Sequence, residues 1–403
     1  MADISSEDLI QILKTGRNLV FLDSSRLNGE ENSSYLFYSP ETVLQISSAS
    51  DIGPFFSSLE LALSRGYYAA GWFSYELGYL LHKPLAGLLE HKSNRLPLAW
   101  LGLFRQPVEI TSLASEKLFR GNRLSRGLDF RPRLSVTKKR FTEHINEIHE
   151  YIKSGDTYQV NYTVRSFFDL QGVSAFQLYC HLRNRQRVNY AAFIRNGAMR
   201  ILCLSPELFF RKRGDRIWSK PMKGTVRRGR DAGEDILLFK FLSQDEKNRA
   251  ENVMIVDLIR NDLGRICTKG TVRVPDLFKV EPYETLFQMI SRVEGKVSRS
   301  FTWEDCFRAL FPCGSITGAP KIRTMEIISE LEDSPRGIYT GAIGFITPDH
   351  DACFNVAIRT IMAQGERCEL GIGSGITIYS DPGKEFEETL LKAAFLGKDV
   401  IHD

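Results

Sequence analysis

The chain lacks the features that would place it in a membrane or in an oxidising compartment. Its apolar runs stop well short of the ~20 residues that a membrane span requires, and its first ten residues, MADISSEDLI, have no basic start leading into an apolar stretch. Its seven cysteines form an odd number without a CxxC pair, so neither a disulfide framework nor a zinc knuckle is indicated. We therefore expect a cytoplasmic protein with free thiols and no membrane contact.

The sequence also has little net charge and no repetition. It holds 53 Lys and Arg against 49 Asp and Glu, a net charge of +4 in 403 residues, which is too small an excess to indicate a nucleic-acid partner. We find no internal repeat and no low-complexity segment. What remains is an ordinary globular composition, 43% hydrophobic and 25% charged, in a chain long enough for two domains.

Strand-like and helix-like segments divide the chain into two regions. Apolar strand-like segments in the first region lie at 18–23, 34–39 and 67–81. A basic, proline-bearing stretch at 126–140 indicates a linker, and a helix with one apolar face follows at 141–155. We predict an N-terminal region over 1–133 and a second domain over 134–403.

The second region alternates strands with helices. Strands are expected at 157–168, 189–195, 200–205, 216–224, 337–346, 352–363 and 367–379, and helices at 234–262, 319–332 and 384–397. Short polar turns such as TPDHD and QGER join neighbouring strands, which favours antiparallel pairing. The predicted fold class is α+β, built on antiparallel sheet rather than on a doubly wound parallel one.

One expected helix carries charged residues inside an apolar segment. In DEKNRAENVMIVDLIRNDLGR, Glu251 lies on the same helical direction as Ile255, Leu258 and Asp262. If this helix is buried, its charged side chains must be paired or must bind a ligand. Taken alone, the helix is explained as well by a structural ion-pair network.

A second helix with carboxylates follows a glycine-rich strand. It begins after Ser-Asp-Pro at 380–382, a capping residue followed by proline. Glu385, Glu388 and Lys392 fall on one face, which an exposed amphipathic helix would also explain. The preceding strand, ELGIGSGITIY, has a glycine at every second position, as expected if a ligand approached its backbone: Gly371, Gly373 and Gly375. Carboxylates beside such a ligand suit Mg²⁺ better than zinc.

A third cluster, GSITGAPK at 314–321, places small polar residues at the start of a helix. Free backbone N–H groups and Lys321 would hold an anion there. The segment does not match the GxxxxGK[ST] phosphate loop, and a plain helix cap explains it equally well.

Six motifs, in order, resemble one family, the chorismate-binding enzymes. This family includes component I of anthranilate synthase and of aminodeoxychorismate synthase, and the isochorismate and salicylate synthases. The motifs are PMKGTVRRG, KNRAENVMIVDLIRNDLGR, GSITGAPKIRTMEI, YTGAIGF, FNVAIRT and GIGSGITIYSDPGKEFEETLLKA. They cover about residue 138 to the C-terminus. The resemblance implies two facing antiparallel β-sheets with helices packed outside, as in anthranilate synthase component I, and a site for dianionic chorismate and Mg²⁺.

The resemblance also implies residue roles, motif by motif. Glu251 and Glu388 would ligate Mg²⁺, with Glu385 acting nearby through water. A divalent cation lets acidic side chains and substrate carboxylates share one pocket. The carboxylates and neighbouring oxygens of the substrate would be held by Arg359, Tyr339, Thr317, Lys392 and the backbone at Gly224, Gly373 and Gly375.

Two positions indicate which nucleophile is delivered. Gln159 stands where the water-using isochorismate and salicylate synthases resemble one another in carrying a lysine base. An amide cannot take a proton from water, so ammonia is favoured. Lys223, in PMKGT, resembles the lysine of the PIKGT motif of aminodeoxychorismate synthases, where anthranilate synthases have alanine. Such a lysine is implied to attack the ring at C2 and expel the C4 hydroxyl before ammonia adds at C4, with Thr225 as a further candidate catalytic residue.

The lysine chemistry places a physical demand on the fold. A primary amine is nucleophilic only when unprotonated, which requires desolvation or a nearby cation that lowers its pKa. Met222 and Gly224 offer an apolar, closely packed setting for Lys223.

Three features depart from the family pattern. Gln288 replaces a histidine that is linked to pyruvate elimination in anthranilate synthases, which argues against aromatisation of the product. Asn248 replaces a glutamate found in many members, so a water-mediated part of the metal shell is expected to differ. FLDS at 21–24 resembles only in part the LLES motif of tryptophan-regulated relatives, so tryptophan inhibition is not expected.

The sequence is therefore most like the aminodeoxychorismate synthase component I group. That likeness implies formation of 4-amino-4-deoxychorismate from chorismate and ammonia, for p-aminobenzoate and folate. No glutaminase motif surrounds any cysteine, so a separate glutamine amidotransferase subunit would supply ammonia. A separate aminodeoxychorismate lyase would act on the product. Two alternatives remain open: anthranilate synthase component I, and a non-catalytic chorismate-binding regulatory protein.

Overall fold

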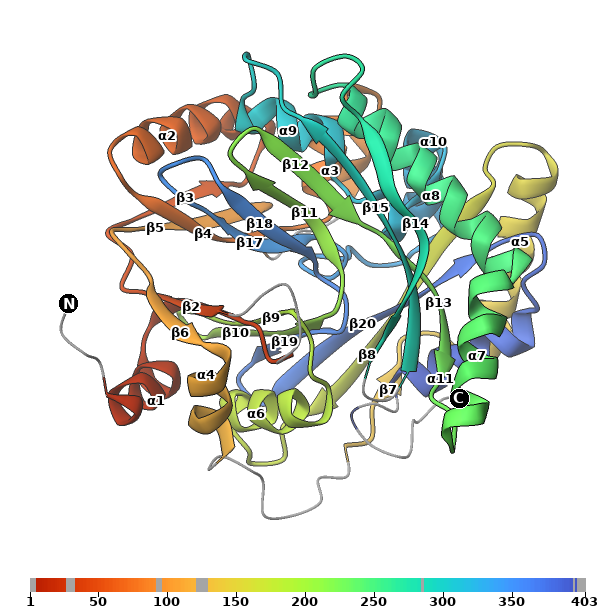
Figure 1. Cartoon of the computed structure of the whole chain (residues 1–403), viewed down its shortest axis with the longest axis horizontal. Helices are drawn as coiled ribbons and strands as arrows, with labels where there is room; N and C mark the ends of the chain where they lie inside the picture. Colours follow the sequence, from red (N-terminus) through yellow and green to blue (C-terminus); the bar gives the residue numbers. More distant parts are fainter. Residues whose placement is uncertain are drawn as a thin grey trace.

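Two antiparallel sheets face each other in the computed structural model, and helices cover their outer sides (Figure 1). The structure describes residues 5–26, 33–91, 96–120, 130–283, 286–393 and 396. Among these, the first sheet has the strand order β16 (Gly318–Ala319), β8 (Gln159–Asp169), β20 (Arg367–Ile376), β19 (Thr360–Gln364), β10 (Met199–Ser205), β9 (Tyr190–Asn196), β1 (Asn18–Asp23), β2 (Ser33–Tyr38) and β6 (Val108–Thr111), with β7 (Arg133–Leu134) paired to β8. The predicted fold class is confirmed.

The second sheet is equally large. Its order is β13 (Met222–Arg227), β15 (Leu286–Lys296), β12 (Arg216–Lys220), β11 (Leu208–Arg213), β18 (Ala352–Val356), β17 (Ala342–Ile346), β4 (Tyr68–Phe73), β5 (Ala99–Phe104) and β3 (Thr42–Ile46), with β14 (Arg273–Pro282) paired to β15. Strands from both sides of residue 134 therefore join both sheets. The boundary between 1–133 and 134–403 stays a prediction.

The α-helices of the described chain are α1 (Ser6–Thr15), α2 (Ile52–Ser64), α3 (Leu77–Leu81), α4 (Ser112–Arg120), α5 (Lys138–Lys153), α6 (Ala175–Arg185), α7 (Ala232–Gln244), α8 (Glu246–Gly264), α9 (Trp303–Leu310), α10 (Lys321–Leu331) and α11 (Pro382–Ala393). On α5, Phe141, Ile145 and Ile148 are buried, as the apolar face predicts. The Phe141 ring packs edge-on against Phe386 of α11, with ring centroids 5.3 Å apart. None of these helices has the length and apolar character of a membrane span.

Apolar side chains from both sheets form part of the core between them. Trp72 of β4 lies opposite Trp100 of β5 in the strand register, and the two buried rings stack with centroids 4.8 Å apart. Residues directly opposite on antiparallel strands share a face, so this pair is presented to the other sheet. There it packs with Val20 of β1 and Ile194 of β9.

Several predicted elements were wrong in extent because one apolar run hid a break. The predicted strand 216–224 divides at Pro221, which has no backbone N–H for the ladder. The predicted helix 234–262 divides at Asp245, whose side chain instead caps α8 by accepting from the Asn248 N–H at 2.8 Å. In 67–81 only β4 is a strand, and α3 follows it.

The predicted strand 352–363 was wrong in a more consequential way. It is two strands in different sheets, β18 in the second and β19 in the first. The chain crosses between the sheets at 357–359, where Arg359 has a φ of +51°. The strand predicted over 337–346 begins only at Ala342, so Tyr339 lies on the loop before it. Arg359 and Tyr339, two of the candidate substrate-binding residues, thus lie on turns outside the strands.

Candidate active site

The glycine face of β20 is filled by protein side chains. A Cβ added at Gly371 would lie 2.1 Å from the Tyr339 ring, and one added at Gly373 would lie 3.1 Å from the Tyr339 hydroxyl oxygen. A Cβ at Gly375 would lie 2.7 Å from Gln159 Nε2 and 3.6 Å from Lys223 Nζ. The alternate glycines were expected to let a ligand approach. In the structure they let three candidate site residues lie against the strand.

Lys223 reaches this face from the other sheet. It belongs to β13, at the end of the second sheet, whereas Gln159 and Gly375 belong to neighbouring strands of the first. Its side chain is partly exposed by surface area, but its amine is desolvated, and this lowers its pKa. The carboxylates of Glu251 and Glu207 act in the opposite direction, and Lys392 lowers the pKa further. Desolvation thus shifts the pKa of Lys223 in the direction that a nucleophilic amine requires.

Gln159 is a buried amide without a hydrogen-bond partner. Its side chain is fully buried, and in the described part of the chain neither Oε1 nor Nε2 is paired. Leaving a buried polar group unpaired costs roughly 1–3 kcal/mol. An amide held in this state beside Lys223 is suited to a small polar ligand that accepts from Nε2 and donates to Oε1.

Glu207, between β10 and β11, was missed in the sequence. It is buried, and this desolvation raises the pKa of its carboxyl to about 7. A hydrogen bond with Ser315 and the positive charge of Lys223 oppose the rise. Oε1 has no hydrogen-bond partner among the described residues. A signal was present, since Glu207 is the one acidic residue in the apolar segment LCLSPELFF.

The predicted metal ligands lie on α8 and α11. Glu388 forms an ion pair with Lys392 at 2.7 Å, and Lys392 Nζ also donates to the Gly373 carbonyl at 2.8 Å. Glu385 accepts from the Ser380 hydroxyl at 2.8 Å. Burial, followed by the negative charge of Glu388, raises the pKa of Glu385. Glu251 has no ion pair or hydrogen bond from its side chain within the described residues.

These carboxylates fit Mg²⁺ in their chemistry. They offer oxygen ligands, and the repulsion between Glu385 and Glu388 is the kind that a cation relieves. They are not gathered into a ligand set, however. Among the residues that the structure describes, no three His, Cys, Asp or Glu side chains are grouped closely enough to hold a metal ion.

Arg359 and Tyr339 are the candidate substrate-binding side chains best placed for a ligand. Burial lowers the pKa of Arg359, and the one hydrogen bond of its guanidinium in the described chain is a long one, 3.5 Å to Gln186 Oε1. A desolvated guanidinium with so little pairing favours a carboxylate. Tyr339 is buried, and this desolvation raises the pKa of its hydroxyl.

Other predicted residues use their polar groups locally. The buried Thr317 hydroxyl donates to the carbonyls of Cys313 and Gly314, both at 3.2 Å. Thr225 is exposed and donates to Gln288 Oε1 at 2.9 Å. Lys321 forms a buried ion pair with Asp262 at 2.7 Å, as expected of a structural role.

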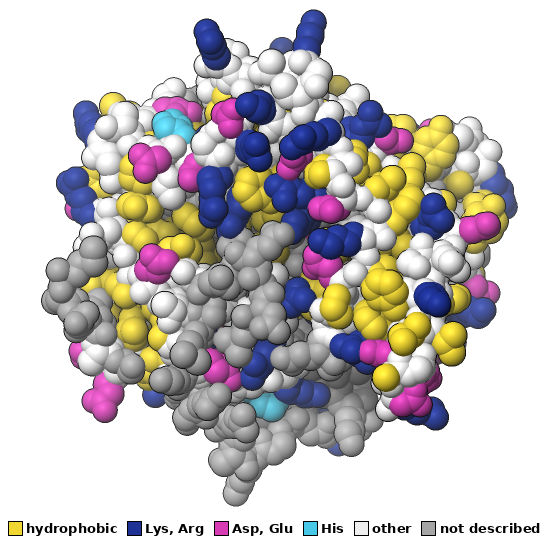
Figure 2. All heavy atoms as spheres, viewed as in Figure 1, with side chains coloured by type: hydrophobic (Ala, Val, Ile, Leu, Met, Phe, Trp, Pro, Cys, Tyr) yellow, Lys and Arg dark blue, Asp and Glu magenta, His cyan; other side chains and the backbone are white. Residues whose placement is uncertain are grey.

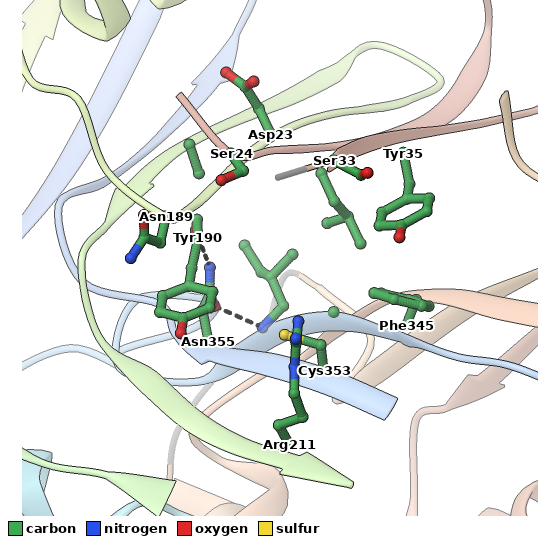
Figure 3. Close-up of a pocket in the computed structure, with 14 residues that line it drawn as sticks. Asp23, Ser24, Ser33, Tyr35, Asn189, Tyr190, Arg211, Phe345, Cys353 and Asn355 are labelled. Carbon is green, nitrogen blue, oxygen red and sulfur yellow. Dashed lines mark hydrogen bonds between the residues drawn. The ribbon is translucent and has the colours of Figure 1, made fainter. Parts of the chain in front are cut away.

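A small cavity between the sheets includes residues of the FLDS segment (Figure 3). Leu22, Asp23 and Ser24 line it from β1 and the residue after, and Arg211, Cys353 and Asn355 line it from the second sheet. Its volume is about 40 Å³, which is room for water and far below the ~300 Å³ of a small-ligand pocket. The Asp23 carboxylate accepts hydrogen bonds from Tyr179, Ser34, Ser115 and Arg183. The absence of tryptophan inhibition stays a prediction.

A much larger cavity, of about 1090 Å³, is lined by none of the predicted site residues. Arg165 and Glu332 contribute to its wall, and the Arg165 guanidinium lies 5.8 Å from the Tyr339 ring centroid. Size alone therefore does not locate the candidate site, whose chemistry is concentrated around Gly375.

Comparisons with known proteins agree with the motifs. A family model described as chorismate binding enzyme matches residues 26–398. Aminodeoxychorismate synthase component 1 of Bacillus subtilis (strain 168) is 42% identical over 257 residues, 64% of this chain and 54% of that protein. Anthranilate synthase component 1 of Streptomyces coelicolor is 40% identical over 260 residues, 64% of this chain and 51% of that protein. The probable chloroplastic aminodeoxychorismate synthase of Oryza sativa is 38% identical over 74% of this chain but 35% of its own length.

Solved structures share the fold at low sequence identity. Anthranilate synthase component I from Streptococcus pneumoniae TIGR4 aligns with a TM-score of 0.77 at 23% identity, covering 98% of both chains. The menaquinone-specific isochorismate synthase of Escherichia coli aligns with a TM-score of 0.75 at 18% identity, covering 96% of this chain and 90% of that one. The chain spans about a third to a half of the length of the curated relatives named above, and the family model matches residues 26–398 of its 403. It belongs to the chorismate-binding enzyme family.

Proposed function

We propose that this chain is component I of an aminodeoxychorismate synthase, which converts chorismate and ammonia to 4-amino-4-deoxychorismate. The observation that carries the proposal is Lys223, a desolvated amine with a lowered pKa, close to the unpaired Gln159 amide. An anthranilate synthase would need no nucleophilic lysine here. The relatives of both kinds are about 40% identical to this chain, so the choice rests on the site.

The reaction proceeds in two displacements. Lys223 Nζ attacks C2 of the ring, both conjugated ring double bonds shift, and the C4 hydroxyl leaves as water with a proton from Glu207. A carboxyl with a pKa of about 7 is about half protonated at neutral pH and can supply this proton. Ammonia, held by Gln159, then adds at C4, both ring double bonds shift back, and the Lys223 amine is released from C2. The nitrogen now bonded to C4 loses a proton, and Glu207 takes this proton up.

Substrate binding falls to the underused polar groups around this centre. Arg359 pairs with a substrate carboxylate, and the Tyr339 hydroxyl and the backbone of Gly373 and Gly375 contact neighbouring oxygens. Lys392, already at the Gly373 carbonyl, lies beside them. Figure 2 shows Lys and Arg side chains gathered around the middle of the face, where Figure 1 shows the two sheets facing each other. A positive field there attracts a dianion.

Mg²⁺ would be held by Glu251, Glu388 and, through water, Glu385. Bound there, it would neutralise carboxylate charge on the substrate and so allow an anionic ligand beside anionic side chains. The Lys392 ammonium, now paired with Glu388, would then be free to contact substrate oxygens.

A glutamine amidotransferase subunit is the proposed source of ammonia, and an aminodeoxychorismate lyase is the proposed next enzyme. No cysteine of the chain lies in a glutaminase nucleophile motif. The proposed location of this protein is the cytoplasm.

The test is mass spectrometry of the product formed from chorismate, Mg²⁺ and an ammonium salt, without a lyase. We expect 4-amino-4-deoxychorismate, which keeps the enolpyruvyl group, and a Lys223 adduct when the reaction is quenched early. Fluorescent anthranilate as the product would replace the proposal with anthranilate synthase. Chorismate that stays unchanged, even with a competent glutaminase, would favour the regulatory protein.

A further inference from the structure

Gly224, the residue after Lys223, lies at a bulge in β13. In the pairing of β13 with β15, Lys223 is opposite Met289 and Thr225 is opposite Gln288, so Gly224 is the extra residue. Its φ is +73°, a conformation that favours glycine. In a regular strand, side chains two residues apart share a face. The bulge breaks that rule, so that Lys223 reaches toward Gly375 while Thr225 is exposed.

Gln288 joins both sides of this bulge. Its Nε2 donates to the Gly224 carbonyl at 2.9 Å, and its Oε1 accepts from the Thr225 hydroxyl at 2.9 Å. One side chain thus holds the peptide between Gly224 and Thr225 and the Thr225 hydroxyl.

Asn248 closes the bulge from the other side. It lies in the first turn of α8, where the Asp245 side chain caps its backbone N–H. A Cβ added at Gly224 would lie 2.8 Å from Asn248 Cγ and 3.0 Å from Asn248 Cβ, so the amide side chain packs directly on the glycine. Two of the departures from the family pattern, Gln288 and Asn248, therefore meet at Gly224, which adjoins Lys223.

We propose that Gln288 and Asn248 are positioning residues for Lys223: Gln288 fixes the Gly224 bulge by two hydrogen bonds, Asn248 fixes it by packing, and the bulge turns the amine into the site. Neither side chain touches the reacting atoms. The inference rests on the proposed function and deepens it, because it explains how a strand at the end of a sheet presents its lysine to the opposite sheet.

Two pairs of variants separate these roles. Gln288→Met keeps the length of the side chain and removes both hydrogen bonds, whereas Gln288→Glu keeps the acceptor for Thr225. Asn248→Ala removes the packing on Gly224, whereas Asn248→Leu keeps a similar volume. Lys279→Gln is the control for a surface change, because Lys279 is exposed on β14, the strand that pairs with the Gln288 strand β15.

Each variant is measured in three ways. Steady-state kinetics with chorismate and an ammonium salt give kcat and KM, thermal unfolding gives Tm, and competitive acetylation with acetic anhydride gives the reactivity of the Lys223 amine by mass spectrometry of its peptide. For Gln288→Met and Asn248→Ala we expect kcat to fall about 10-fold, while KM stays within about 3-fold of its original value. We expect the acetylation rate of Lys223 to change by about 10-fold as well. Gln288→Glu and Asn248→Leu retain more of both.

A purely structural role predicts a different pattern. If Gln288→Met and Asn248→Ala lower Tm but leave the acetylation of Lys223 as in the control, the positioning role is overturned. It is overturned equally if kcat and acetylation both match the control. Failure of the proposed function has its own signature: the unsubstituted protein would form no aminated product, while the acetylation of Lys223 would still report whether Gln288 and Asn248 hold it.

Discussion

Glu207→Gln is expected to stabilise the protein in mildly alkaline solution while slowing its reaction. Burial raises the pKa of this carboxyl from an ordinary 4.5 to about 7, so the folded chain holds the proton more tightly than the unfolded chain does. The stability that this provides is complete below about pH 4.5 and is lost as the pH rises through about 7. Above that range, the folded chain must bury a carboxylate.

The size of the effect follows from the two pKa values. One pKa unit corresponds to ~1.4 kcal/mol, so a rise from 4.5 to about 7 amounts to about 3 kcal/mol of unfolding free energy. A glutamine of the same shape has no such penalty. Between about pH 5 and about pH 8, the variant should therefore gain most of this amount relative to the unsubstituted protein.

Urea unfolding of both proteins across this pH range is the assay. Taking the difference between them cancels the titration of every other group that the substitution leaves alone. A difference that is the same at both ends of the range would refute burial as the origin of the raised pKa. The same variant should lower kcat by about 100-fold or more, because an amide cannot donate the proton, and the unsubstituted enzyme should lose activity as Glu207 ionises above about pH 7.

Other variants test the nucleophile, the substrate contact, the metal and the packing. Lys223→Ala should abolish amination while calorimetry still detects chorismate binding, and a retained rate would rule out the covalent step. Arg359→Gln should raise KM for chorismate by roughly 10- to 100-fold, the worth of a charged hydrogen bond, and an unchanged KM would place the carboxylate elsewhere. EDTA should stop turnover and added Mg²⁺ should restore it, and Glu388→Gln should need more Mg²⁺ for the same rate. Full activity in EDTA would rule out a metal requirement. Gly371→Ala puts a Cβ 2.1 Å from the Tyr339 ring and should cost about 1–3 kcal/mol in urea unfolding, so unchanged stability would contradict the packing.

The fold class was predictable because its evidence is local. Alternating apolar residues, polar turns and a Ser-Asp-Pro helix start at 380–382 are each contained in a few residues. The errors arose where a decision depends on distant segments. Nothing within 352–363 marks the crossing from one sheet to the other, because β18 and β19 are both largely apolar and each pairs on one side with a strand far away in the sequence, β18 with β11 and β19 with β10. Arg359 lies at that crossing.

The glycines of β20 predicted a close approach to the strand, but they did not identify the groups that approach it. Their alternate spacing does indicate a close approach to the strand, and the structure contains one at each position. The approaching groups belong to Tyr339, Gln159 and Lys223, which come from a loop, a neighbouring strand and the opposite sheet. A glycine records that space is needed at a backbone position, whereas the identity of the neighbour is set by the whole topology.

Glu207 was hidden for a related reason. A single carboxylate in an apolar segment can have a structural or a catalytic role. Only the groups around it distinguish these two roles. Those surroundings are Ser315 and Lys223, which lie about 100 residues and 16 residues away in the sequence. The amine, the acid and the Gln159 amide thus come from three separate segments. Under the proposed mechanism, a change at any one of them would alter the nucleophile or the proton transfer, which would let one fold serve relatives named for different reactions.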